Sequence, residues 1–153
     1  MSMQPGVIVK SSTSGSIFVQ RALYAQGGAT PESLIVFTSI YDDFYGGDSN
    51  MDGNIQPPYT GAWNYVTIDG TAIDANVKFK DCIFRYGGSG SAYGAIRCVN
   101  SSPSVDSCLF AYNSTGISVE GASNPTIKNS SLYGNTYFAV NNTGNAFCVF
   151  ADH

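Results

Sequence analysis

The sequence feature that most constrains the fold is an internal repeat centred on residues 94–140. Two sets of segments match when the chain is shifted along itself by steps of about 21–26 residues. The matching segments are 96–98, 117–119 and 138–140 in one set, and 76–86, 103–113 and 125–135 in the other. A period of this length is typical of chains that stack one structural unit on the next.

Apolar residues recur in three columns of the repeat, and their alternation slips by one residue at the same place in each copy. The columns are Phe79, Val105 and Ile127; Phe84, Phe110 and Leu132; and Ile96, Ile117 and Phe138. The slip falls at Asp81, Ser107 and Asn129. Because a slip of one residue turns every later side chain to the other face of a strand, the chain must bend there. The pattern predicts an all-β fold of short strands stacked in parallel about 4.8 Å apart, a β-solenoid with coils of about 21–26 residues.

Three further observations favour this stacking. No Asn-Gly or Asp-Gly pair lies between two repeat strands, where a tight hairpin would need it. Lys80, Asp106 and Lys128 align on an outward column with alternating charge, which stabilises neighbouring strands. Asn113 and Asn135 align at a turn, where a stacked amide can satisfy backbone groups of the next coil.

Length and charge limit the class of protein. The 153 residues suit one domain. A formal charge of −4 argues against nucleic-acid binding, which needs a basic face, and no apolar run approaches the roughly 18 residues of a membrane span. Residues 1–4 lack the regions of a signal peptide. We therefore expect residues 1–153 to be a single domain from a larger protein.

An acidic insertion at residues 40–63 interrupts the strand pattern. Within it, residues 48–53 read Asp-x-Asn-x-Asp-Gly, the first half of a calcium-binding loop, although the twelfth position is Tyr59 and not the usual glutamate. Crowded carboxylates repel one another and favour a cation, and hard oxygen ligands without nearby histidine or cysteine suit Ca²⁺. A solvated acidic turn is the alternative. The candidate metal ligands are Asp42, Asp43, Asp48, Asn50, Asp52 and Asn54.

The four cysteines and the single histidine give weak support for other chemistry. Cys82, Cys98, Cys108 and Cys148 lack zinc-ligand spacing. Cys82 and Cys108 are neighbours in one column, and we interpret them as buried free thiols, with a disulfide as the alternative. His153 is the terminal residue, so an internal Ser-His-Asp or Cys-His arrangement is not expected.

Isolated acids and aromatic residues leave two weaker possibilities open. Catalysis on a polysaccharide would need paired carboxylates or a basic residue beside a metal. The candidates are Asp69, Asp74, Asp81, Asp106, Arg85 and Arg97. Tyr86 and Tyr112 align and, with Trp63, could offer surfaces for stacking sugars, but packing of the turns explains them equally well.

Several stretches resemble a known family, the right-handed parallel β-helix modules with a pectate-lyase-like fold found in secreted bacterial and archaeal cell-surface proteins. The stretches are 6–10, 23–27, 35–39, 42–53, 84–88, 102–105 and 124–127. The resemblance implies an extracellular location and a scaffold or adhesive role. Two departures are the Gly61-Ala62 pair before Trp63, where Gly-Asp is expected, and an end near residue 151, where a closing coil is expected.

These observations together predict a non-catalytic, calcium-stabilised β-helix module that acts as a scaffold, in adhesion or in glycan binding. The expected partners are a polysaccharide or another surface protein. One alternative is a polysaccharide lyase or hydrolase of the same fold. A second alternative is a self-assembling fibre subunit that associates end to end through its open coils.

Overall fold

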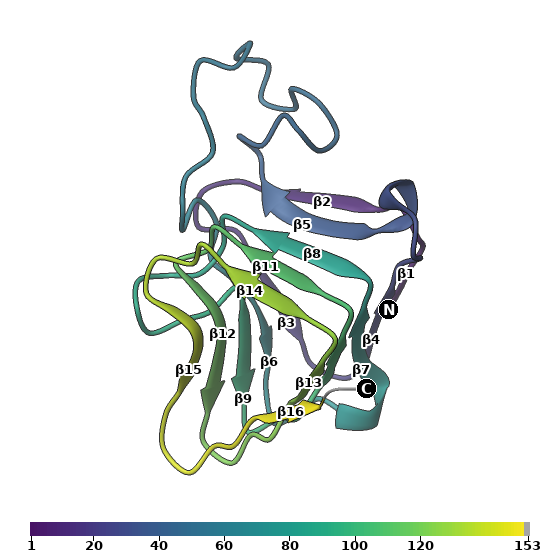
Figure 1. The fold of residues 1–153 in the computed structure, drawn as a ribbon, viewed down its shortest axis with the longest axis vertical. Coiled ribbons are helices and arrows are strands. Elements are labelled where there is room, and N and C mark those ends of the chain that lie inside the picture. Colours follow the sequence, from purple (N-terminus) through teal and green to yellow (C-terminus); the bar gives the residue numbers. More distant parts are fainter. Residues whose placement is uncertain (152–153) are drawn as a thin grey trace.

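Three parallel β-sheets make up the computed structural model, which describes residues 1–151 (Figure 1). Sheet A contains β1 (Ser2–Met3), β4 (Leu23–Gln26), β7 (Val77–Lys80), β10 (Ser104–Asp106), β13 (Thr126–Lys128) and β16 (Val149–Ala151). Sheet B contains β2 (Ile8–Ser11), β5 (Ile35–Ser39), β8 (Cys82–Arg85), β11 (Leu109–Ala111) and β14 (Ser131–Tyr133). Sheet C contains β3 (Ser16–Val19), β6 (Tyr65–Ile68), β9 (Ile96–Val99), β12 (Thr115–Glu120) and β15 (Phe138–Asn142).

The chain visits the sheets in a fixed cycle, A then B then C, and each return stacks a strand beside its predecessor in the same sheet. The only helical elements among residues 1–151 are two 3₁₀ turns, η1 (Pro31–Ser33) and η2 (Asp74–Asn76). None of these helical turns is long and apolar enough to cross a membrane. The prediction of an all-β fold with parallel stacked strands is therefore confirmed, and the arrangement is compatible with a parallel β-helix.

The strand register confirms two of the predicted apolar columns and corrects the third. Val105 pairs with Phe79 and Ile127, and Phe110 pairs with Phe84 and Leu132, as the repeat predicts. In sheet C, Ile117 pairs with Ile96 as predicted. Its partner on the other side, however, is Val140 and not Phe138. Val140 packs against the core, whereas Phe138 lies opposite Thr115 and is exposed.

From β7 onward, the coils bend at corners where one residue takes a left-handed backbone conformation. At the corner between sheets A and B, Asp81, Ser107 and Asn129 have φ angles of 51°, 53° and 50°. These are the three positions of the slip in the sequence, so the predicted bend is confirmed. The other corners repeat the device at Tyr86, Tyr112 and Gly134, and at Asn100 and Gly121. A bulky residue at positive φ is uncommon. The sequence pattern aligns Tyr86 and Tyr112 but does not predict their left-handed backbone conformation.

The core is a stack of side chains inside the three sheets. Phe37, Phe84 and Phe110, from successive strands of sheet B, lie face to face with ring centroids 4.7 and 4.8 Å apart. All three are at most 1 % exposed. Offset stacking of this kind adds to the free energy gained by burying the rings. Parallel strands place equivalent positions of successive coils above one another. The aligned phenylalanines of the sequence therefore form a stack of rings in the core.

The predicted asparagine ladder runs along the corner between sheets B and C. Asn113 is fully buried. Its Oδ1 accepts from the Gly87 N–H at 2.8 Å, and its Nδ2 donates to the Phe84 carbonyl at 3.0 Å. Asn135 repeats the pattern one coil on, accepting from the Asn113 N–H at 3.0 Å. The amides thus satisfy backbone groups that the bend withdraws from the sheet ladders.

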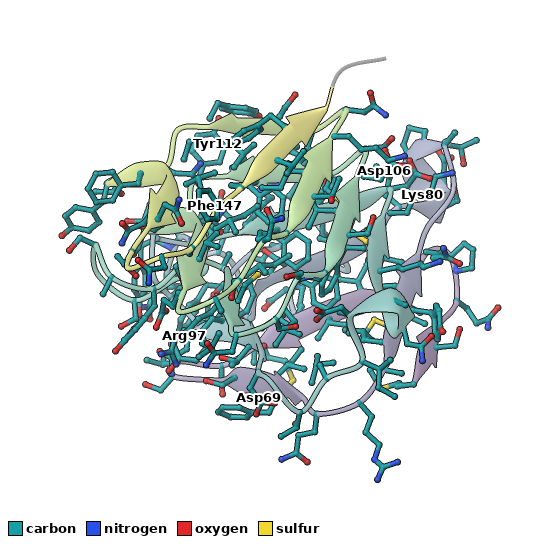
Figure 2. The ribbon with its side chains drawn as sticks, turned by 90° about the horizontal axis from the view of Figure 1, so that it is seen from below. Asp69, Lys80, Arg97, Asp106, Tyr112 and Phe147 are labelled. Carbon is teal, nitrogen blue, oxygen red and sulfur yellow. The ribbon has the colours of Figure 1, made fainter. Side chains whose placement is uncertain are left out.

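The outer faces carry the expected charge column. Lys80 and Asp106 lie on neighbouring strands of sheet A (Figure 2), and the Lys128 Nζ lies 3.3 Å from the Asp106 Oδ2. At the two ends of the stack, strands β14, β15 and β16 and strands β1, β2 and β3 have no further strand beside them among the described residues.

Candidate metal centre

The acidic insertion leaves the coils after β5, rejoins them at β6, and protrudes from the end of the body (Figure 1). The hydrogen bonds of its two central aspartates are local. The Asp48 carboxylate accepts from the N–H groups of Asp52 at 3.1 Å and Gly53 at 2.9 Å. The Asp52 carboxylate accepts from the N–H groups of Ile55 and Gln56, both at 3.2 Å. Aspartates favour such turns because their side chains hydrogen-bond the backbone a few residues on.

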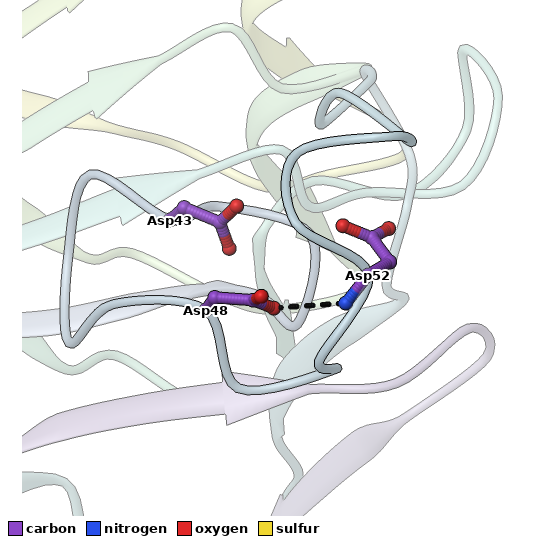
Figure 3. Close-up of side chains that lie close together, drawn as sticks. All are labelled: Asp43, Asp48 and Asp52. Atoms are coloured by element: carbon purple, nitrogen blue, oxygen red, sulfur yellow. Dashed lines mark hydrogen bonds between the residues drawn. The ribbon is translucent and has the colours of Figure 1, made fainter.

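Three carboxylates meet inside this loop. Asp43, Asp48 and Asp52 each offer an oxygen atom within 4.8 Å of the others (Figure 3). The Oδ1 atoms of Asp43 and Asn50 are buried and have no hydrogen-bond partner among the described residues. The Asn50 Nδ2 donates to the Asp52 Oδ2 at 2.7 Å, which fixes the amide beside the carboxylates. Three of the six candidate ligands therefore bring oxygen atoms together, and Asn50 is hydrogen-bonded to one of these three carboxylates.

The donor set fits a hard cation. Carboxylate and amide oxygens are the ligands of Ca²⁺, which takes about 6–8 of them at about 2.3–2.6 Å. Three like charges at this separation repel one another, and a cation between them would remove that repulsion. Buried oxygen atoms without a donor are costly, and coordination would satisfy them.

Asp42 lies outside this group of carboxylates. Asp42 is 2 % exposed, accepts from the Thr38 Oγ1 at 2.6 Å, and has its Oδ2 3.6 Å from the Arg85 Nη1. No oxygen of Asp42 belongs to the group of three carboxylates. Asn54 is exposed and lines an adjoining pocket. The Asp42–Arg85 pair could not be predicted from the sequence. Arg85 lies on β8, far along the chain from Asp42, and no local sequence pattern connects the two residues.

The adjoining pocket lies between the loop and the corner after β8 and has a volume of about 340 Å³. Its walls include Asp43, Phe44, Asn54, Gln56, Arg85 and Tyr86. A pocket of this volume lies within the range of small-molecule sites, about 300–1,000 Å³.

Arg85 is held within a group of aromatic rings. Its Cζ lies 4.8 Å from the ring centroid of Tyr86, 5.3 Å from that of Tyr45 and 5.7 Å from that of Phe44. Its Nη2 donates to the Tyr86 Oη at 2.7 Å, and its carbonyl accepts from the Trp63 Nε1 at 2.7 Å. The guanidinium therefore already has a carboxylate, a hydroxyl and several ring faces around it.

Two of the other candidate catalytic carboxylates, those of Asp69 and Asp74, already accept hydrogen bonds. Asp69 accepts from the Thr71 N–H at 2.9 Å, and Asp74 accepts from the Ser101 Oγ at 2.6 Å. Asp69 and Asp106 lie on opposite sides of the view in Figure 2. The fourth aspartate of the set, Asp81, occupies a corner with its φ at 51°.

Arg97, on the outer face of sheet C, forms a two-pronged ion pair with Glu120. The two N···O distances are 2.7 and 2.8 Å. Hydrogen bonding to Glu120 raises the pKa of Arg97 further above its usual range. The Arg97 Cζ also lies 4.3 Å from the Tyr93 ring centroid. The ion pair therefore connects the neighbouring strands β9 and β12 and is consistent with a structural role.

The four cysteines are free thiols, which supports the interpretation of Cys82 and Cys108. Their Sγ atoms lie 3.2 Å from the carbonyl oxygens of Lys80 and Asp106, respectively. The neighbouring Cys108 thiol and burial raise the pKa of Cys82, and burial raises the pKa of Cys98. Thiols in such surroundings are poor nucleophiles. His153 lies outside the described residues.

The aligned tyrosines stack on each other. The Tyr86 and Tyr112 ring centroids are 6.1 Å apart with an interplanar angle of 18°, and Trp63 is 1 % exposed. Each tyrosine therefore turns ring surface toward its neighbour, which favours packing of the turns over a row of open stacking platforms.

Comparisons with protein-family models, with curated proteins and with solved structures found no match to this chain. The functional argument therefore depends on the loop and the pocket themselves.

Proposed function

We propose that this chain is a non-catalytic, calcium-stabilised module of an extracellular or cell-surface protein, with a scaffold, adhesive or glycan-binding role. The fold proposed with it is a right-handed parallel β-helix of the pectate-lyase-like type, with coils of about 21–26 residues. Fold alone does not give function, so the proposal is carried by the acidic loop.

The observation that carries the proposal is the group formed by Asp43, Asp48, Asp52 and Asn50. Its three carboxylates approach within 4.8 Å of one another, and two buried oxygen atoms beside them lack hydrogen-bond donors. No lysine or arginine lies between residues 22 and 77 to balance these charges from within the segment. A Ca²⁺ ion would supply both the missing charge and the missing partners.

Thermal melting with calcium and with a chelator tests this proposal. A ligand that binds only the folded chain stabilises it by about 2.7 kcal/mol at a hundredfold excess over Kd. For a chain of this length, such a gain corresponds to a rise in Tm of about 5–10 °C. Identical melting curves in calcium and in chelator would contradict the proposal.

Two variants make the test specific. Asp43→Asn removes one charge from the group without removing any of the loop hydrogen bonds described above, so it should weaken the calcium response without changing the fold. Glu32→Gln removes an exposed carboxylate at η1, outside the loop, and should leave the calcium response unchanged. An equal loss of response in both variants would indicate general screening of negative charge.

A second candidate function, end-to-end self-assembly, is favoured by the C-terminal end of the stack. Within residues 1–151, strands β14, β15 and β16 have no strand on their outer side, and several large apolar side chains lie exposed there. They are Tyr137, Phe138, Phe147, Val149 and Phe150. Unpaired edges with apolar neighbours favour association with another chain.

The enzyme alternative has less support. Arg85, a basic residue on the wall of the adjoining pocket, is paired with Asp42 at 3.6 Å and surrounded by aromatic rings. Incubation with acidic and neutral polysaccharides, followed by assays for unsaturated and reducing-end products, tests this alternative directly.

A further inference from the structure

We propose that the pocket between the acidic loop and the β8 corner binds a neutral pyranose ring of a glycan. The inference rests on the proposed glycan-binding role and assigns it a place and a ligand class. It arises from three properties of the pocket: an exposed aromatic wall, unpaired amide side chains, and the absence of a spare positive charge.

The aromatic wall is Phe44. This side chain is 80 % exposed, although it belongs to a loop with a fixed local hydrogen-bond pattern. Its ring centroid lies 4.9 Å from that of Tyr45 in an edge-to-face arrangement, and the Arg85 Cζ lies 5.7 Å from the Phe44 centroid. An exposed large apolar side chain on the wall of a pocket is typical of a binding surface. The C–H face of a pyranose is flat and apolar and matches such a ring.

The polar wall is formed by Asn54 and Gln56. Both are exposed, both line the pocket, and neither side-chain amide forms a hydrogen bond with another described residue. Each amide carries donors and an acceptor without charge. A hydroxyl group also donates and accepts, so vicinal sugar hydroxyls fit these amides. Pro57 and Pro58 add apolar surface beside them.

The charges of the lining exclude an anionic ligand. Arg85 is the single cationic group of the wall, and Asp42 already neutralises it. Asp43 belongs to a group of three carboxylates that stays net negative when a Ca²⁺ ion neutralises two of its three charges. A uronate or a phosphate would meet repulsion from these carboxylates.

A cationic ligand is also disfavoured, because the protein supplies its own. Aromatic rings with a carboxylate would suit an ammonium group. In this pocket, however, Arg85 already lies within 6 Å of the centroids of Phe44, Tyr45 and Tyr86. A neutral polyhydroxyl ring is the ligand class that remains.

Titration of the calcium-loaded chain tests the proposal. The probes are neutral cello-, manno- and galacto-oligosaccharides, an oligogalacturonide as the anionic probe, and choline as the cationic probe. The readout is the fluorescence of Trp63, the single tryptophan, which donates to the Arg85 carbonyl on the pocket wall. At least one neutral oligosaccharide should give a saturable change with Kd in the millimolar range or tighter, and the other two probes should not.

The variants Phe44→Ala and Gln56→Ala should each weaken that binding about tenfold, a typical effect of losing one good contact. Both residues are exposed, so the variants should melt like the wild-type chain. Phe147→Ala, which removes another exposed phenylalanine outside the pocket, should bind like the wild type.

Three results would overturn the proposal: no saturable change with any neutral oligosaccharide, preferential binding of oligogalacturonide or choline, or wild-type affinity in Phe44→Ala. The rise in Tm with calcium is measured separately, without sugar. A chain that gains stability from calcium but binds no sugar retains the proposed metal site and loses this pocket. A chain that binds sugar equally in chelator retains the pocket without the metal.

Discussion

The asparagine ladder offers the sharpest test of how the coils are held together, through the substitution Asn113→Ala. The side chain is fully buried and serves two backbone groups, the Gly87 N–H at 2.8 Å and the Phe84 carbonyl at 3.0 Å. Alanine fills the position but cannot pair with either group. Each buried group left without a partner costs about 1–3 kcal/mol, so the loss should total about 2–5 kcal/mol.

The assay is urea unfolding, with the midpoint and the slope m measured for each variant. A fall in midpoint at unchanged m reports a loss of stability of the same folded state. Since a domain of this kind has about 5–15 kcal/mol in total, Asn113→Ala should remove a large fraction of it.

Substitutions of two further asparagines serve as comparisons for the loss of stability. Asn135 performs the same role on the last coil but is only partly buried, so water can replace its amide and Asn135→Ala should lose about 1 kcal/mol. Asn124 is exposed, and Asn124→Ala should change stability by less than about 0.5 kcal/mol. A loss in Asn113→Ala no larger than that in Asn124→Ala would refute the view that the ladder holds the corner.

Three other predictions concern thiols, acid and assembly. Burial raises the pKa of Cys148 to about 11, so a thiol reagent should modify Cys148 first, with a rate that rises up to about that pH, and Cys98 only on unfolding. Partial burial raises the pKa of Asp106, but hydrogen bonds from neighbouring side chains lower it by more. Its stabilisation is therefore complete above the unfolded pKa of about 3.9 and is lost as pH falls through the lower folded value, and Asp106→Asn should flatten the acid limb of the unfolding curve. Phe150, 64 % exposed at the open edge, should promote concentration-dependent light scattering, which Phe150→Lys should reduce.

The repeat was sufficient to predict the stacking because each coil buries apolar side chains at equivalent positions against the coil before it. The columns through Val105 and Phe110 followed from the sequence spacing alone. The prediction for the column through Ile117 was wrong because the register changes between Asn135 and Phe138. Asn135 still matches Asn113, but Phe138 matches Thr115, so one residue is inserted between the ladder and β15. Because both register choices place an apolar residue opposite Ile117, hydrophobicity could not distinguish them.

The loop shows where local pattern stops being informative. Asp48 and Asp52 could be identified because residues 48–53 match the first half of a calcium-binding loop. Asp42 and Asp43 are adjacent and looked equivalent, yet the backbone turns Asp42 inward to Thr38 and Arg85 while Asp43 faces the other carboxylates. That choice depends on a partner about forty positions away, and no local rule contains it.

Arg85 explains why the loop is part of the coil and not a free insertion. Near the start of the loop, Asp42 pairs with its guanidinium, and near the end the Trp63 indole donates to its carbonyl. One residue of β8 therefore contacts both ends of the insertion. Asp43, the next residue after the buried Asp42, carries an oxygen of the candidate metal centre. Calcium bound by the loop would for this reason restrain Asp42 and Arg85, and through them the corner after β8, so that metal binding and coil stability should be measured as one coupled transition and not as two.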